Sequence, residues 1–183
     1  DKAARRISLD PASLVAIAPQ APLSNLSDEA LTVLPDGGLL TFYEANGANV
    51  NPQPTAHRFD AAGAPAGVLP SPTLEYRITD ATPADAEGRF WVINYFFPGD
   101  RDKLKPAADP IVARFGAGVT HAACPQVERL VELRAVAGRI ERTEAPPVQL
   151  TLLNCATARN WEGLAELPGR GFLLATDQHP ATI

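Results

Sequence analysis

The chain has 183 residues, with 16 Lys and Arg against 21 Asp and Glu, which gives a net charge of −5 at pH 7. This length suits one compact domain with a hydrophobic core, and a composition of 45% apolar and 20% charged residues excludes a disordered chain. The acidic balance disfavours binding to nucleic acid, because phosphate recognition needs a basic surface, and no apolar run approaches the roughly 20 residues of a membrane span.

Proline is the most informative residue type in the composition. The 18 prolines are spread along the whole chain, and each one removes a backbone donor and interrupts a helix. Long helices therefore have almost no room, and we expect an all-β fold of short strands joined by turns. Methionine is absent, so we also expect a processed piece of a longer protein.

The first part of the chain predicts a strand-rich region. An apolar run at 14–18, enclosed by prolines, predicts one or two strands that enter the fold. Residues 28–44 then contain two apolar, β-branched or aromatic runs on either side of a Pro-Asp-Gly sequence at 35–37, which is typical of a hairpin turn. A further strand and turn are predicted at 57–63.

A pattern of an acidic start, a turn with glycine and an apolar second strand occurs three times. When Glu29, Asp80 and Glu162 are placed in register, large apolar residues coincide ten and eleven positions further on. These residues are Leu39 and Leu40, Phe90 and Trp91, and Phe172 and Leu173. The spacings of 51 and 82 residues leave room for two more strands in each interval, as in four-stranded propeller blades with an insertion in the second.

We therefore predict a single all-β, β-propeller domain over 1–183. About three four-stranded blades are expected, which is half of a larger propeller. The expected repeats lie near 26–70, 74–153 and 158–183. Residues 127–136 also fit a helical face, but pairing with 148–153 across a glycine turn favours a strand.

Short motifs within these repeats resemble the phytase-like β-propeller family, which is also described as esterase-like. The motifs are residues 160–165 and 171–177, together with 28–31, 35–37 and 79–82. The resemblance covers roughly 25–180 and implies a secreted or envelope β-propeller that hydrolyses a small ester or phosphoester ligand. Because such a propeller has about twice as many blades, it also implies a missing N-terminal half or a partner chain that supplies the others.

Equivalent positions of the first strands converge on the central channel of a propeller, so the aligned acids are expected to meet there. Crowded carboxylates raise each other's pKa unless a cation joins them, and Ca²⁺ prefers carboxylate and amide oxygens. The candidate calcium ligands are Glu29, Asp80, Asn160 and Glu162. The alternative interpretation is that these acids are solvated or pair with an arginine, Arg77 or Arg159.

A second set of equivalent positions follows the second strand of each repeat, among loops where binding sites are often built. We expect Glu44, Asn94 and Tyr95 to contact a ligand. Asp177 and His179 are adjacent in the same set, and we expect this pair to act as catalytic acid and base.

The two cysteines, Cys124 and Cys155, flank the strands predicted at 127–136 and 148–153. If these strands pair, the cysteines lie near each other at the open end of the hairpin, where a disulfide is geometrically reasonable. Buried free thiols are the alternative. The disulfide interpretation places the protein in the periplasm or outside the cell.

Two functions are compatible with these observations. The resemblance favours a metal-assisted hydrolase of ester or phosphoester bonds, in which the acids hold the cation. The alternative is a non-catalytic propeller that binds a ligand or a protein. The absence of G-x-S-x-G, P-loop, H-E-x-x-H and G-x-G-x-x-G motifs favours this alternative, and the aromatic residues at 91–97 are expected to pack in the core rather than cradle a ligand.

Overall fold

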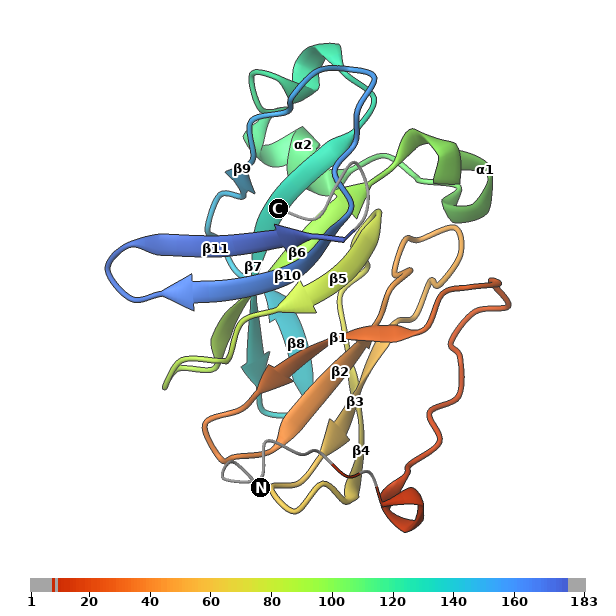
Figure 1. Cartoon of the computed structure of the whole chain (residues 1–183), viewed down its shortest axis with the longest axis vertical. Coiled ribbons are helices and arrows are strands. Elements are labelled where there is room, and N and C mark those ends of the chain that lie inside the picture. Colours follow the sequence, from red (N-terminus) through yellow and green to blue (C-terminus); the bar gives the residue numbers. More distant parts are fainter. Residues whose placement is uncertain (1–7, 9, 178–183) are drawn as a thin grey trace.

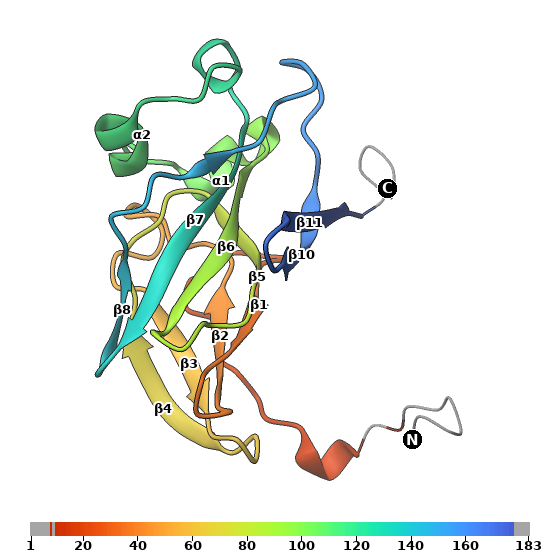
Figure 2. The same ribbon diagram turned by 90° about the vertical axis from the view of Figure 1, so that its left-hand side faces the viewer.

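The computed structural model describes residue 8 and residues 10–177, which form a mostly β structure of three antiparallel sheets (Figure 1). The all-β expectation is confirmed at this level. The sheets follow one another along the chain, and the first strand of the second sheet lies between the first strands of the other two (Figure 1, Figure 2). No sheet closes into a ring within the described residues, and the propeller stays a prediction.

The first sheet contains the predicted hairpin. Its strands, in spatial order, are β1 (Asp28–Val33), β2 (Leu39–Tyr43), β3 (Thr55–Phe59) and β4 (Pro65–Pro70). In the turn between β1 and β2, the Gly37 N–H donates to the Leu34 carbonyl at 2.9 Å. Gly37 has a φ of +81°, which side-chain-bearing residues rarely adopt, and this explains the glycine of the turn sequence.

The second sheet carries the insertion and is the largest of the three. Its strands are β5 (Arg77–Ala81), β6 (Arg89–Phe96), β7 (Val127–Val136) and β8 (Arg139–Arg142), and β9 (Val148–Gln149) also pairs with β7. The strand interpretation of 127–136 is therefore correct, but the glycine turn joins this strand to β8, and only Val148–Gln149 of the expected strand at 148–153 forms and pairs with it. The third sheet consists of β10 (Trp161–Leu167) and β11 (Gly171–Thr176) in the described part of the chain.

Helix is confined to short segments, most of them in the insertion between β6 and β7. The segments there are η2 (Pro98–Asp100), α1 (Arg101–Leu104), α2 (Pro110–Phe115) and η3 (His121–Ala123). No helix in the described residues is long and apolar enough to cross a membrane. The helical segments in the described residues are short, as the proline content predicts, because proline at the first helical turn permits a short helix even where it prevents a long one.

The expected strand at 14–18 does not form. This stretch follows a short 3-10 helix, η1 (Pro11–Ser13), and makes no β pairing. Leu14 remains 74% exposed, so the apolar run does not enter the core. Prolines on both sides remove donors that a sheet ladder requires, which explains the difference.

The first strands of the three sheets share a β-bulge at the aligned acids. The register shifts at Glu29 in β1 and at Glu162 in β10. In β5 the irregularity lies between Ile78 and Ala81 and includes Asp80. A bulge takes a residue out of the ladder and redirects its side chain, so the three acids occupy equivalent backbone positions.

Strand β6 is buried on both faces because it contributes to three hydrophobic cores, one of them through Phe96 at its end. Phe90 belongs to the core shared with the first sheet, where its ring lies 5.6 Å from that of Phe42. Ile93 belongs to the core shared with the third sheet, which includes Trp161. This two-sided burial accounts for the nearly continuous apolar sequence of β6.

Candidate functional site

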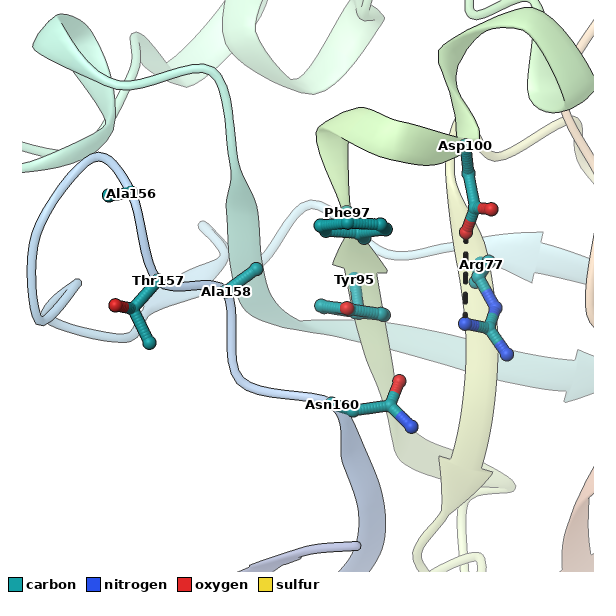
Figure 3. A pocket seen from close by; sticks show the side chains of 8 residues that line it. All are labelled: Arg77, Tyr95, Phe97, Asp100, Ala156, Thr157, Ala158 and Asn160. Atoms are coloured by element: carbon teal, nitrogen blue, oxygen red, sulfur yellow. Dashed lines mark ion pairs between the residues drawn. The ribbon is translucent and has the colours of Figure 1, made fainter. Parts of the chain in front are cut away.

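An open pocket of about 490 Å³ lies between the second sheet and the segment that leads into β10 (Figure 3). Its lining residues are Arg77, Tyr95, Phe97, Asp100, Ala156, Thr157, Ala158 and Asn160. Arg77 lies on β5 and Tyr95 on β6, so two strands form one side. The opposite side is the loop at 156–160.

Arg77 is the charged centre of this region. Its guanidinium group forms a hydrogen-bonded ion pair with Glu44 and lies 3.9 Å from the Asp100 carboxylate. The same group lies 5.7 Å from the centre of the Tyr95 ring, within cation–π range. Burial lowers the pKa of Arg77, but Glu44 and the more distant Glu162 outweigh that effect and raise it, so Arg77 stays charged.

Glu44 is completely buried beside Arg77, just after β2. One carboxylate oxygen binds Arg77, and the other, Oε2, has no hydrogen-bond partner among the described residues. Burial raises the pKa of Glu44 to about 7; Arg77 opposes this shift and Glu29 adds to it. The group therefore changes its charge near neutral pH.

The three aligned acids do not share one environment. Burial raises the pKa of Glu162, the charge of Glu29 adds to the shift, and Arg77 opposes it, so these two acids act on each other around Arg77. Asp80 instead accepts hydrogen bonds from the backbone N–H groups of Ala81 (2.8 Å) and Leu164 (2.6 Å). Asp80 thus connects β5 to β10, whereas Glu29 and Glu162 feel the charge of Arg77, whose ion pairs in the described residues are with Glu44 and Asp100.

The calcium site stays a prediction. Within residues 10–177, no group of three or more His, Cys, Asp or Glu side chains has the arrangement of a metal site. Of the four candidate ligands, Glu29, Glu162 and Asn160 lie in the region of Arg77, and Asn160 opposes the rise in the pKa of Glu162. These three residues are the ones that could contribute to a cation site here.

The residues predicted to contact a ligand from the ends of the second strands have different roles: Asn94 is structural and Tyr95 lines the pocket. Asn94 is fully buried; its amide donates to the Glu75 carbonyl at 2.8 Å, and its oxygen accepts from Arg129 at 2.8 Å. It therefore stabilises the second sheet rather than facing a ligand. Tyr95 lines the pocket, and burial raises its pKa, so its hydroxyl stays protonated.

The structure describes only one residue of the predicted acid–base pair. Asp177 follows β11, where its backbone N–H donates to the Asn160 carbonyl at 3.2 Å, and its charge raises the pKa of Glu162. His179 lies outside the described residues. The pairing of Asp177 with His179 stays a prediction.

The loop side of the pocket is fixed covalently. Cys124 and Cys155 form the predicted disulfide, with 4.8 Å between their Cα atoms. Next to it, the Asn154 side-chain oxygen accepts from the N–H groups of Ala156 and Thr157, each at 2.7 Å. The lining at 156–158 is therefore held in place by both a crosslink and a side-chain-capped turn.

Sequence reasoning missed part of this site. Phe97 was expected in the core but is 47% exposed in the pocket, whereas its neighbour Phe96 is buried. Asp100 was not singled out, and Arg77 was named only as a possible partner for the acids. A usable signal was the Pro-Gly sequence at 98–99, which ends β6 and places Phe97 beyond the sheet.

Comparison with family models, curated proteins and solved structures finds no match to this chain. The phytase-like family therefore remains an expectation that rests on the sequence motifs alone.

Proposed function

We propose that this chain is a ligand-binding module of the β-propeller type that works outside the cytoplasm and binds a small molecule in the pocket around Arg77. The observation that carries this proposal is the pocket itself. Its volume of about 490 Å³ is within the usual range of small-molecule sites, and its lining combines an exposed aromatic ring with several polar groups.

The disulfide supports both parts of the proposal. It fixes one side of the pocket before a ligand arrives, and a pre-formed site loses less free energy to ordering when it binds. Disulfides also persist mainly in oxidising compartments, which favours the periplasm or the cell exterior.

The lining favours binding over nucleophilic catalysis. None of its eight described residues is a histidine or a cysteine, so the described lining holds no hydroxyl or thiol nucleophile paired with an imidazole base. Arg77 is engaged by Glu44, which reduces its ability to stabilise a developing negative charge.

A hydrolase is the second candidate, and Glu44 is the observation that favours it. A carboxyl group with a pKa of about 7 is suited to general acid catalysis near neutral pH. In this alternative Glu29 and Glu162 hold a Ca²⁺ ion beside the substrate, as the alignment of the acids predicts. Complete burial of Glu44 limits its access to a substrate.

Further blades, from the same protein or from a partner chain, belong to the proposal. Exposed apolar side chains on β1 and β11 support it: Leu31 and Val33 on β1 are 43% and 41% exposed, and Leu173 on β11 is 60% exposed. Apolar sheet surfaces of this kind are usually covered by another layer.

Ligand-detected NMR against a fragment library tests the binding function. We expect fragments that bind the native protein, lose binding in Phe97→Ala, and keep it in Val119→Ala, a control at a site that is 96% exposed and outside the pocket. Hydrolysis of p-nitrophenyl acetate and p-nitrophenyl phosphate, with and without Ca²⁺, is measured in parallel. Turnover that Glu44→Gln abolishes would instead establish the hydrolase.

A further inference from the structure

The charges in the pocket select against charged ligands. Arg77 and Asp100 are the two charged members of the described lining, and 3.9 Å separates their nearest nitrogen and oxygen atoms. An anion cannot use Arg77 freely, because Glu44 already occupies one edge of its guanidinium group. A cation meets the permanent charge of Arg77 itself, so neither sign of ligand is favoured.

The remaining lining offers hydrogen bonds of both kinds. Figure 3 shows the Tyr95 hydroxyl and the Asn160 amide directed into the space between the loop and the two strands. A phenol hydroxyl donates and accepts, and an amide does the same with separate atoms. Together with the Asp100 carboxylate as acceptor and the guanidinium as donor, they suit a ligand that carries many hydroxyl groups.

Phe97 adds an apolar platform at the edge of the pocket. Phe97 is 47% exposed, although it follows directly after a buried strand. Gly99 makes room for the ring, since a Cβ atom on Gly99 would lie 2.3 Å from a ring carbon. The backbone is thus shaped to keep an aromatic surface where a ligand can contact it.

We infer that the pocket binds a neutral sugar ring, with one apolar face of the ring on Phe97 and its hydroxyls on Asp100, Tyr95 and Asn160. The inference rests on the proposed binding function and adds the chemical class of the ligand. A sugar ring has C–H groups on its faces and hydroxyls, each both donor and acceptor, around its edge. It therefore matches an aromatic platform beside a charge-balanced set of polar groups.

A set of probes that share one ring tests this assignment. Glucose, glucosamine and glucose 6-phosphate differ in charge but keep the ring, and galactose, mannose and cellobiose vary the hydroxyl pattern. We expect at least one neutral sugar to bind with a Kd in the millimolar range and its charged counterpart to bind about tenfold more weakly, measured by NMR titration of the native protein. Tighter binding of glucose 6-phosphate or glucosamine would overturn the inference.

Two variants locate the binding. Phe97→Ala should weaken neutral-sugar binding roughly threefold to tenfold, and Tyr95→Phe, which keeps the ring, should weaken it by a similar factor. Val119→Ala should leave it unchanged. Unchanged binding in both pocket variants, or no neutral sugar with a Kd below ~10 mM, would contradict the inference. If library fragments still bind at Phe97 in that case, the proposed binding function stands and only the assignment of a sugar as the ligand is wrong. If nothing binds there, both the binding function and the sugar assignment are wrong.

Discussion

Arg77 and Arg159 lie at equivalent positions, and each forms an ion pair with a buried glutamate, but the two ion pairs lie in different surroundings. Each lies three residues before an aligned acid and pairs with a completely buried glutamate of the preceding sheet. Arg77 binds Glu44, and Arg159 binds Glu128. The first pair lies at the pocket, and the second lies at the junction of the second and third sheets.

The two pairs differ in how completely the buried carboxylate is satisfied. Glu128 accepts from the Arg159 backbone (3.0 Å) and side chain (2.8 Å) and from the indole N–H of Trp161 (2.8 Å), so both of its oxygens are bound. Glu44 keeps one oxygen without a partner among the described residues. The complete pair stabilises the fold, whereas the incomplete one leaves a buried carboxylate oxygen next to Arg77 without a hydrogen bond from the described residues.

The largest expected effect is the loss of the complete pair. Glu128→Ala removes the acceptor for three donors and leaves a buried guanidinium without its counter-ion, which should cost about 3–5 kcal/mol of unfolding free energy. Urea denaturation measures this cost, with Glu166→Ala, an exposed residue of β10, as the control. A loss below about 1 kcal/mol would show that the pair is not structural.

Removal of the crosslink should have the next largest effect. Replacing both Cys124 and Cys155 with serine should lower the unfolding free energy by about 3 kcal/mol, because the unfolded chain gains the freedom of a loop closed across a separation of 31 residues. Fragment binding should weaken as well, because the loop at 156–158 loses its anchor. Binding that is unaffected would remove the disulfide from the description of the site.

Glu44 should give the stability a pH dependence that Glu44→Gln removes. Its pKa is about 7 in the folded state against 4.5 for an ordinary glutamate, so between these values the folded state holds a proton that the unfolded state has lost. Stability should therefore fall as pH rises from 4.5 to 7, by up to about 3 kcal/mol, and level off above.

Denaturation curves of the native protein and Glu44→Gln at several pH values measure how much Glu44 contributes to the pH dependence of the unfolding free energy. The raised pKa values of Asp80 and Glu162 act in the same direction, so the difference between the two proteins isolates Glu44. Parallel pH profiles for the two proteins would mean that Glu44 does not titrate in this range.

Added Ca²⁺ should have the smallest effect on stability. Its effect on the melting temperature also distinguishes the two candidate functions. If Arg77 rather than a cation balances Glu29 and Glu162, the melting temperature should be the same with added Ca²⁺ and with chelator. A calcium site would instead add about 2.7 kcal/mol at a hundredfold excess over Kd. Glu162→Gln would then weaken this response, whereas Glu87→Gln, in the exposed turn before β6, would not.

Local features of the fold were predictable from the sequence. The hairpin over 28–44 follows from turn chemistry, and the disulfide from the strands that its cysteines flank. The repeat alignment placed Glu29 and Glu162 at equivalent positions, and both residues lie at β-bulges. Each of these features depends on residues that are neighbours in sequence or related by one strand pairing.

Features that depend on several sheets at once were not predictable. Asp80 has the same backbone position as Glu29, yet its shorter side chain binds an N–H group of β10. The pairing of Arg77 with Glu44 was one alternative among several, because nothing local indicates which acid a buried arginine will meet. Phe97 was assigned to the core because the aromatic sequence at 95–97 does not indicate that its last residue is exposed and the two before it are buried.

The most direct test of the pocket as the ligand site is an amide-resolved NMR titration of the native protein with the neutral sugars. The account predicts that resonances of Tyr95, Phe97, Ala158 and Asn160 shift in a saturable way, while those on the first sheet, at β3 and β4, do not. Saturable shifts confined to another surface, or none at any pocket residue, would contradict it.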